Sequence, residues 1–367
     1  MSSVRPLSAE IMEKLREYDY ETFLIGASVP HTILDKDDEL RSRFKIKGRD
    51  SMKSQITKML SQKVALQTGK SVNYSKPDLT ILVSMSDQEI TISLRSVWLS
   101  GKYVKLKRGL PQRSSICGIC NGLGCAECSY RGRSLDSVQG RITDFLTKAF
   151  EAESCNFVWL GSEDENSLVK APGRPFYVEV VKPKKRFAMK DKLGNSSRSK
   201  HRKTIIFRSK EIQVRELELL ERRITDVPQF EITAKIFLRK KSGAPALDPV
   251  TMETVETNFE DINAAVRLSR KFRTVQKEIH SIRCHPIDNG ERLELKIDCD
   301  GGIPLKKLVS GQDDTVTPNL RHYFDSYEID REEPFDVLSV RIKDPLLVFP
   351  RTGNATKDTH NAPEYDE

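Results

Sequence analysis

The sequence lacks an apolar run that could cross a membrane, because no stretch reaches about 18 consecutive apolar residues. Residues 1–21 carry charges throughout and have no apolar centre, which argues against a secretory signal. Internal repeats are also absent. These absences predict a cytoplasmic protein without membrane contact, and the length of 367 residues predicts two or three domains, each with its own core.

The chain has little net charge outside one segment. It holds 61 Lys+Arg and 53 Asp+Glu, a formal net charge of +8. Residues 182–203 alone hold ten Lys/Arg and one Asp, a net charge of +9 that leaves −1 for the rest. Such a segment suits a polyphosphate partner, because neutralising phosphates releases condensed counterions. The alternative is a solvated loop that only keeps the protein in solution.

Four of the seven cysteines form two closely spaced C-x-x-C pairs, at Cys117, Cys120, Cys125 and Cys128. Disulfides are not expected in a chain without an export signal, so the spacing predicts a Zn²⁺ ion held by four thiolates. The cluster has no nearby His and no open ligand position, which favours structural over catalytic zinc. Unbound or redox-active thiols are the alternative. The remaining cysteines are scattered and expected to be buried small hydrophobes: Cys155, Cys284 and Cys299.

Hydrophobic periodicity predicts an α+β organisation. Helices are expected at residues 8–24, 50–68, 135–152, 210–223, about 258–272 and 303–310. Strands are expected at residues 78–84, 89–99, 156–160, 174–181, 204–208, 230–239, 277–285, 291–299 and 335–342. The polar tail after Pro350 is expected to be disordered.

Residues 100–112 interleave basic side chains with an aromatic one. Lys102, Lys105, Lys107 and Arg108 alternate with Tyr103 and its apolar neighbours. Cations beside an aromatic ring suit an RNA backbone and its bases, so these residues are candidates for RNA binding. A solvated strand face is the alternative.

Three segments resemble a known family. Residues 76–112 look like the end of a THUMP-type RNA-binding domain. Residues 159–169 (WLGSEDENSLV), followed by Gly-Arg-Pro-Phe at 173–176, resemble the active-site region of the archaeal/eukaryotic Pus-ten tRNA pseudouridine synthases. The C-terminal signature of that family resembles residues 293–311 together with Thr-Pro-Asn-Leu at 317–320. The order of RNA-binding segment, cysteine cluster and catalytic segment is also similar.

The resemblance implies an α+β protein in four parts. These are a THUMP-like α/β RNA-binding domain at 1–115, a four-cysteine zinc knuckle at 116–133, a mixed or antiparallel-sheet pseudouridine synthase domain at 134–350 and a disordered tail at 351–367. It implies isomerisation of uridine to pseudouridine at position 54 and/or 55 of the tRNA T-loop, on a flipped-out nucleotide. The only metal is then a structural zinc, catalysis needs no cofactor, and tRNA is the partner, with no protein partner required.

By this resemblance Asp164 is the catalytic carboxylate, although residue types alone leave Glu163 and Glu165 as rivals. The carboxylate attacks the base, attacks the sugar or abstracts a sugar proton, and the sequence does not distinguish these paths. Lys306 is assigned as the cation that keeps the carboxylate ionised. Lys307 is its rival, but adjacent helical residues point about 100° apart, so only one can face the pocket.

The sequence departs from the family pattern around the expected pocket. Ser162 stands where relatives carry Arg, and residues 166–168 (Asn-Ser-Leu) replace Asp-Val-Arg. Tyrosines expected in the pocket correspond to Ile232, by the best register, and to Pro304. Loss of both would remove a surface on which a base can stack. The aromatic residues that could replace it are Phe207, Phe230 and Phe237.

The basic segment begins directly after the strand that follows the catalytic loop. Its first cations are therefore expected beside the pocket, where they would guide the tRNA backbone: Lys182, Lys184, Lys185 and Arg186. Arg174 is expected either to bond a phosphate or to anchor the loop to a carboxylate.

Two other functions compete with catalysis. A non-catalytic tRNA-binding or tRNA-chaperone protein could retain the same fold, and the missing pocket tyrosines favour it. A THUMP-linked methyltransferase should carry a glycine-rich nucleotide loop after a strand. The only glycine-rich run, residues 118–124, lies inside the cysteine cluster, which disfavours that class.

Overall fold

A computed structural model describes residues 4–46, 48, 50–87, 89–188, 205–268, 273–312 and 315–343 of the chain. The expected tail at 351–367 and residues 189–203 of the basic segment lie outside these ranges. Within them, no helix is both long enough and apolar enough to span a bilayer.

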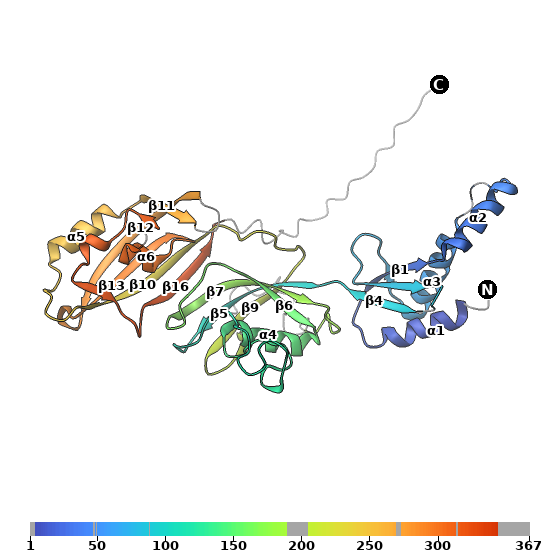
Figure 1. Ribbon diagram of the computed structural model, residues 1–367, viewed down its shortest axis with the longest axis horizontal. Helices are drawn as coiled ribbons and strands as arrows, with labels where there is room; N and C mark the ends of the chain where they lie inside the picture. The colour runs from blue at the N-terminus through green and yellow to red at the C-terminus, as the bar shows by residue number, and fades with distance from the viewer. Residues whose placement is uncertain are drawn as a thin grey trace, which may run out of the picture.

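The N-terminal part is built on a small sheet with helices packed against it (Figure 1). Its strands follow the order β2-β1-β3-β4, with β1 parallel to β2 and β3 and with β4 antiparallel to β3. Its elements are α1 (Val4–Leu15), β1 (Thr22–Ser28), α2 (His31–Arg43), α3 (Met52–Thr68), β2 (Ser71–Val72), β3 (Leu79–Ser84) and β4 (Ile90–Leu94).

Alternation along β1 and β3 creates one buried face in this domain. Phe23, Ile25 and Ile81 are at most 4% exposed and pack with Ile11 of α1 and Leu60 of α3. Helix α2 contributes no buried residue and extends away from the sheet (Figure 1). This small domain therefore has a core of its own.

The rest of the described chain forms around a sheet of twelve strands. These are β5 (Val97–Lys105), β6 (Ser154–Trp159), β7 (Leu168–Val181), β8 (Ile205–Arg208), β9 (Ile212–Leu220), β10 (Phe230–Lys240), β11 (Ile262–Leu268), β12 (Arg273–Ile287), β13 (Arg292–Asp300), β14 (Val316–Thr317), β15 (Tyr327–Ile329) and β16 (Phe335–Ile342). The helices are α4 (Val138–Phe150), α5 (Pro249–Asn258) and α6 (Leu305–Ser310), with short 3-10 turns η1 (Ala126–Cys128), η2 (Asp288–Gly290) and η4 (Arg321–Tyr323).

The middle of this sheet joins two halves. The main strand order is β14-β11-β12-β13-β10-β16-β7-β5-β9-β8, with β15 paired to β10 and β6 paired to β7. Only β16 and β7 pair in parallel, at Asp336↔Leu168 and Val337↔Val169, whereas the other strand pairs of the sheet are antiparallel. The loop from β6 to β7 and the segment from β13 into α6 approach each other, because Lys306 pairs with Asp164.

The predicted domain boundary at residue 115 is wrong. Strand β5 pairs with β7 and β9 and so belongs to the large sheet, although the sequence placed it at the end of the N-terminal domain. The N-terminal sheet ends with Leu94 of β4, and β5 begins at Val97. The covalent link between the two sheets is thus only Arg95 and Ser96.

Several predicted elements agree with the structure and others do not. The helices expected at 50–68, 135–152 and 303–310 correspond to α3, α4 and α6. The helix expected at 8–24 ends at Leu15, and the strand expected at 89–99 is divided between β4 and β5. The helix predicted at 210–223 is strand β9, and the described part of the helix predicted at 258–272 is mainly strand β11.

Candidate active site

A cavity of approximately 390 Å³ lies where the β6–β7 loop meets the β13–α6 loop. Its volume falls within the range typical of small-molecule pockets. The lining comes from residues 161–164, Arg174, Phe230, Ile232, residues 302–307 and Phe335. The structure therefore brings two of the three segments that resemble the family, residues 159–176 and 293–311, together at one site.

Two glycines shape this cavity. Gly161 adopts φ +78°, and a Cβ there would lie 2.6 Å from Nη2 of Arg174. A Cβ on Gly301 would lie 2.2 Å from Cε2 of Phe230, so only glycine lets that ring reach the cavity. These two glycines thus determine the turn of the β6–β7 loop, called the catalytic loop here, and the position of the Phe230 ring in the cavity wall.

Asp164 and Lys306 form an ion pair at the cavity. The side chains are 27% and 41% exposed, so the pair is open to an incoming group. Oδ1 of Asp164 also accepts a hydrogen bond of 2.9 Å from the backbone N–H of Asn166. Burial alone would raise the pKa of Asp164, but the bonds from Lys306 and Asn166 outweigh it and hold the pKa below its usual value. The carboxylate is therefore ionised at neutral pH.

Lys307 lines the same cavity but has a different partner. Its Nζ donates a hydrogen bond of 3.2 Å to Oγ1 of Thr315, whereas Nζ of Lys306 donates to Asp164. This geometry matches the assignment of Lys306, rather than Lys307, as the cation beside the carboxylate.

Glu163 points away from the cavity opening into a buried network. Its side chain is fully buried, and Oε2 accepts a hydrogen bond of 2.7 Å from the Tyr103 hydroxyl. Burial, followed by the negative charge of Glu163, raises the pKa of Tyr103 well above its usual value, so the hydroxyl remains a donor. Glu163 is thus a structural anion beneath the loop, and the structure disfavours it as a rival to Asp164.

Lys105 fixes the backbone of the loop that carries Asp164. Its buried Nζ donates to the carbonyl oxygens of Leu110, Asp164 and Glu165 at 2.7, 2.9 and 3.0 Å. The same nitrogen lies 3.5 Å from Oε1 of Glu163. Burial lowers the pKa of Lys105, while the charge of Glu163 opposes that shift. This one side chain therefore fixes the backbone of Asp164 and of the residue that follows it.

Two residues predicted to bind RNA are buried instead. Arg174 and Lys105 are each 1% exposed. Arg174 Nε donates to the Leu160 carbonyl at 3.0 Å, and its Nη1 lies 3.4 Å from Glu163. The RNA-binding prediction is wrong for both, because a buried guanidinium or ammonium with internal partners cannot reach a backbone phosphate. Of the two roles considered for Arg174, the structure shows the loop anchor.

The other cations of residues 102–108 differ in their surroundings. Lys102 pairs with Glu216 at 2.5 Å, and Lys107 is exposed. Arg108 donates to Asp336 at 2.7 Å and to the Asn166 carbonyl at 2.6 Å, so it supports the end of the catalytic loop. Lys107 is therefore the member of this group best placed to meet a phosphate.

The positions expected to hold tyrosines do line the cavity. Ile232 and Pro304 are both part of its wall, together with the rings of Phe230 and Phe335. Phe207 instead stacks on Phe145, at 4.9 Å between ring centroids. Phe335 was missed by the sequence analysis, because nothing in the sequence around it indicates that β16 passes the cavity.

The first cations of the basic segment do not lie beside the cavity. Strand β7 continues from Arg174 at the cavity to Val181. Lys182, the first of these cations, comes eight residues after Arg174. At about 3.3 Å per residue, that separation is roughly 26 Å. Each of these cations faces an acid: Lys182 pairs with Glu153, Lys184 with Glu17, Lys185 with Asp19 and Arg186 with Asp78. Their predicted place at the pocket mouth is wrong.

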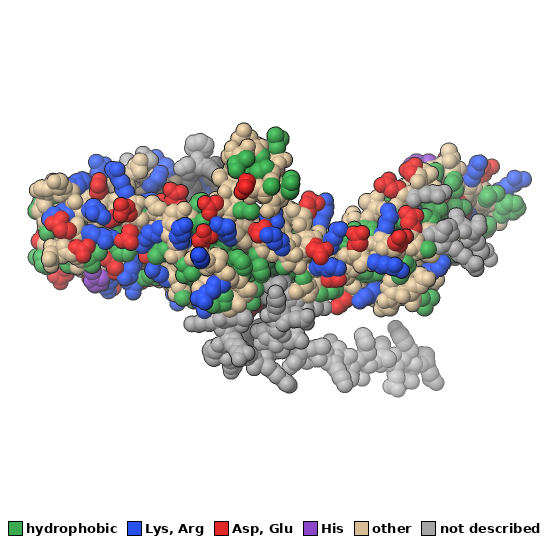
Figure 2. Space-filling view, turned by 90° about the horizontal axis from the view of Figure 1, so that it is seen from below, with side chains coloured by type: hydrophobic (Ala, Val, Ile, Leu, Met, Phe, Trp, Pro, Cys, Tyr) green, Lys and Arg blue, Asp and Glu red, His purple; other side chains and the backbone are tan. Residues whose placement is uncertain are grey.

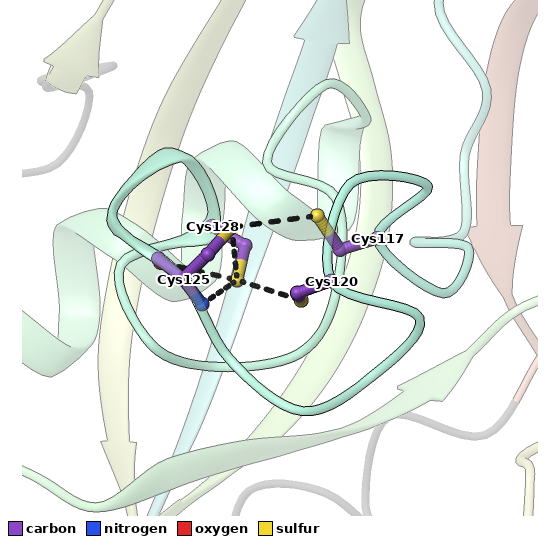
Figure 3. Close-up of side chains that lie close together, drawn as sticks. All are labelled: Cys117, Cys120, Cys125 and Cys128. Atoms are coloured by element: carbon purple, nitrogen blue, oxygen red, sulfur yellow. Dashed lines mark hydrogen bonds between the residues drawn. The ribbon is translucent and has the colours of Figure 1, made fainter.

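The four clustered cysteines face one another on the knuckle between β5 and α4 (Figure 3). Their Sγ atoms lie within 4.8 Å of one another, with Sγ–Sγ distances of 3.9 Å for Cys117–Cys125, 3.8 Å for Cys120–Cys128 and 3.7 Å for Cys125–Cys128. Backbone N–H groups of Gly124 and Cys125 donate to Cys120 and Cys128 at 3.2 Å. The cluster can therefore hold a metal ion.

Comparison with known proteins agrees with this arrangement. Residues 98–341 match the family profile described as "Pus10, C-terminal", and residues 7–84 match "Pus10 THUMP domain, archaeal". The chain belongs to the Pus10 family. The family resemblance of the sequence and the predicted α+β fold class are both confirmed.

Curated relatives of this Pus10-family chain include two archaeal proteins, each named tRNA pseudouridine synthase Pus10. The protein of Nitrosopumilus maritimus is 30% identical over 316 residues, which is 86% of this chain and 77% of the relative. That of Cenarchaeum symbiosum is 31% identical over 304 residues, 83% and 70% respectively. A chain from a crystal structure of a Cbf5-Nop10-Gar1 complex has a TM-score of 0.32, 11% identity and coverage of 66% and 50%, a likeness too remote to bear on function.

Proposed function

We propose that this Pus10-family chain is a tRNA pseudouridine synthase that isomerises a uridine of the T-loop, at position 54 and/or 55, with Asp164 as its catalytic carboxylate. The observation that carries the proposal is the Asp164–Lys306 ion pair, at the cavity where residues 159–176 and 293–311 meet. Membership of the Pus10 family, whose curated relatives are named tRNA pseudouridine synthases, supports the same reaction.

The reaction rearranges bonds within one nucleotide. The bond from N1 of uracil to C1′ of the ribose breaks, the base rotates, and C5 of uracil bonds to C1′. C5 then loses its proton and N1 gains one, so substrate and product are isomers and no oxidant or group donor is consumed. Attack on the base, attack on the sugar and abstraction of a sugar proton all require an ionised carboxylate. Lys306 supplies the charge that keeps Asp164 in that form.

The uridine must leave the base stack to reach Asp164. The cavity offers a flipped-out base the rings of Phe230 and Phe335 in place of the family's tyrosines. The backbone beneath Asp164 is held by Lys105, so the carboxylate meets the nucleotide in a fixed position. Phe230 and Phe335 thus offset the loss of stacking surface at Ile232 and Pro304.

The metal of the cysteine cluster is proposed to be zinc. A tetrahedral Zn²⁺ with Zn–S bonds of about 2.3 Å places its sulfur atoms about 3.8 Å apart. The Sγ–Sγ distances of 3.7 to 3.9 Å agree with that geometry. Zinc there would supply a structural crosslink between the two C-x-x-C turns, because all four positions are filled by thiolates.

Binding of tRNA is proposed to begin at the N-terminal domain, which matches a THUMP profile. Near the cavity, exposed Lys107 can meet a phosphate, whereas Lys105, Arg108 and Arg174 hold the loop. The cytoplasm is the compartment expected for a protein that modifies tRNA.

The assignment of Asp164 is tested with two variants and an unmodified tRNA transcript. Asp164→Asn keeps the shape of the side chain but removes its charge, so no pseudouridine should form although the tRNA is still bound. Glu165→Gln makes the same change on the exposed neighbouring side chain and should leave turnover unchanged. Retained product formation by folded Asp164→Asn would refute the assignment.

A non-catalytic tRNA-binding protein is the remaining rival. It predicts tRNA binding by the wild-type protein and both variants, with no pseudouridine in any of them. Chemical mapping of pseudouridine in the same samples therefore distinguishes the two functions.

A further inference from the structure

The two sheets are joined by very little covalent structure. They share no strand and have separate buried cores, and only Arg95 and Ser96 lie between β4 and β5. Figure 1 shows the narrow connection between the two bodies. A two-residue link alone would leave the N-terminal domain free to swing. Contacts outside the link must therefore determine where that domain sits.

Residues 184–186, called the strap here, supply such contacts. The Asp19 N–H donates to the Lys184 carbonyl at 2.8 Å, and Nζ of Lys184 pairs with Glu17 at 2.9 Å. Nζ of Lys184 also lies 5.8 Å from the centre of the Tyr18 ring. The strap thus grips the segment between α1 and β1 through both its backbone and its side chains.

Arg186 connects the strap to the link itself. Its guanidinium donates to the carbonyl oxygens of Arg95 and Ser96 and pairs with Asp78 at 3.0 Å. Both partners of the Arg186–Asp78 pair are only 10% exposed at their side chains. A buried pair of this kind has a defined geometry, because either charge left alone would be costly to bury.

Asp78 in turn belongs to the N-terminal domain, directly before β3. Its Oδ2 accepts hydrogen bonds of 3.0 Å from the backbone N–H groups of Glu21 and Thr22, and its Oδ1 lies 2.7 Å from Arg95. One carboxylate therefore ties together the start of β1, the link and the strap.

The strap is also fixed to the domain of the large sheet. The N–H groups of Lys184 and Lys185 donate to the carbonyl oxygens of Glu151 and Phe150, at 3.3 and 2.9 Å. The strap also continues directly from β7, which begins after the catalytic loop and pairs with β5 and β6. Strand β7 thus connects the Asp164 loop to the strap, and the strap contacts the N-terminal domain.

We propose that the strap sets the spacing between the RNA-binding N-terminal domain and the cavity at Asp164, and so determines which uridine of a bound tRNA reaches that carboxylate. This inference rests on the proposed function. The strap residues act as positioning residues and need not touch the RNA. The cations at 184–186, expected from the sequence to guide RNA, thus pair with protein acids at a domain joint.

The space around the joint permits the motion that the strap prevents. A cavity of approximately 920 Å³ lies between the two domains, with Lys76 and Asp78 on one side and Trp98 and Arg222 on the other. Loss of the strap would let the N-terminal domain rotate about residues 95 and 96 across this gap. Such a rotation moves a bound RNA relative to Asp164 without changing the cavity at Asp164.

The test compares two substrates of different length. Arg186→Met is assayed on a full-length tRNA transcript and on a T-arm stem-loop too short to reach both the N-terminal domain and Asp164. Arg222→Met removes the same charge from an exposed side chain of the same cavity and is the matched control. We expect Arg186→Met to lower kcat/KM on tRNA at least about tenfold and to spread pseudouridine to neighbouring uridines. Its turnover of the stem-loop should equal that of the wild type.

Exchanging the charges of Lys184 and Glu17 distinguishes loss of their ion pair from a folding defect. Lys184→Glu removes an exposed pair of the strap, with side chains 43% and 64% exposed, and should cause a smaller loss on tRNA. Adding Glu17→Lys restores an opposite pair across the joint and should recover activity on tRNA. Equal losses on tRNA and stem-loop, or a double variant no better than Lys184→Glu, would overturn the inference.

Small-angle scattering provides a readout independent of activity. The Arg186→Met protein should show a broader distribution of interatomic distances than the wild type and Arg222→Met. Identical curves for all three proteins would overturn the inference. If the wild type forms no pseudouridine on either substrate, the proposed function fails, while scattering still decides whether the strap fixes the domains.

Discussion

At the scale of single residues, the charge of Asp164 is balanced between opposing effects. Burial raises the pKa of this carboxyl group, and the bonds from Lys306 and Asn166 lower it further than burial raises it. The ionised form is therefore present above a depressed pKa and is lost as the pH falls through it. Activity that depends on this form should persist into mildly acidic solution.

Lys306→Met should change that pH dependence. Without the ammonium group, burial is opposed only by the weaker remaining interactions, so the pKa of Asp164 rises. The single-turnover rate of pseudouridine formation should then begin to fall at a higher pH than in the wild type. Lys307→Met is the control, because Lys307 bonds to Thr315 rather than to Asp164. Superimposable pH profiles for Lys306→Met and the wild type would contradict the pairing.

The family resemblance pointed to two residues that the fold brings together, whereas other assignments conflict with the structure for a physical reason. Asp164 and Lys306 could be placed by resemblance, and they meet in the structure. Lys105 and Arg174 looked like RNA contacts, because a cation in a sequence carries no sign of its burial. Both cations pair with Glu163, which lies 58 residues after Lys105 in the chain. Only the fold therefore reveals that the Glu163 carboxylate is their partner.

At the scale of elements, the catalytic loop depends on β5. Lys105 of this strand donates hydrogen bonds to the carbonyl oxygens of Leu110, Asp164 and Glu165. Tyr103 of the same strand donates a hydrogen bond to Glu163. The shape of the loop is therefore imposed by a buried polar network on a neighbouring strand.

Lys105→Met should destabilise the protein strongly. The change leaves the Glu163 carboxylate and three carbonyl oxygens with fewer partners, and loss of one member of a buried ion pair costs about 3–5 kcal/mol. Urea unfolding measures the free energy of unfolding directly. Lys107→Met changes an exposed lysine two residues away and should have little effect. Equal stability of the two variants would argue against the loop-anchoring role.

Strand β9 shows why a helix was predicted where the chain forms a strand. Its buried residues Val214, Leu217 and Leu220 recur every three positions, which mimics one face of a helix. An irregularity in the β5–β9 pairing, near Glu216 at φ +50°, inserts the extra residue that breaks the period of two. Pairing with two neighbouring strands then overrides the helix-favouring Glu and Leu residues.

Metal removal should unfold the knuckle but spare the distant parts. Cys117→Ser removes one of four thiolates, so the bound zinc should fall from one ion per chain to well below one, as measured by elemental analysis. Cys155→Ser, outside the cluster, should keep the full metal content. Wild-type protein that is folded normally yet contains no metal would contradict a structural zinc site.

At the scale of the whole molecule, the charges of the described residues are mixed on the face that Figure 2 shows. The face in Figure 2 shows Lys and Arg side chains intermixed with Asp and Glu over both bodies. The four described cations of the basic segment pair with acids near the domain joint. The length of β7 determines where these four cations lie, and that length is not apparent from composition.

Two domains meet at one joint in this molecule. We propose that the strap holds the N-terminal domain, which matches a THUMP profile, at a set position relative to the cavity with Asp164 and Lys306. A protein of this design should act on one region of its RNA rather than on uridines in general. The place of pseudouridine in the product is therefore the most informative quantity.

The most direct measurement is chemical mapping of pseudouridine in an unmodified tRNA transcript after incubation with excess purified protein. We expect near-complete conversion at position 54 and/or 55 of the T-loop, with other uridines unchanged. A transcript that is bound by the protein but contains no pseudouridine would contradict it.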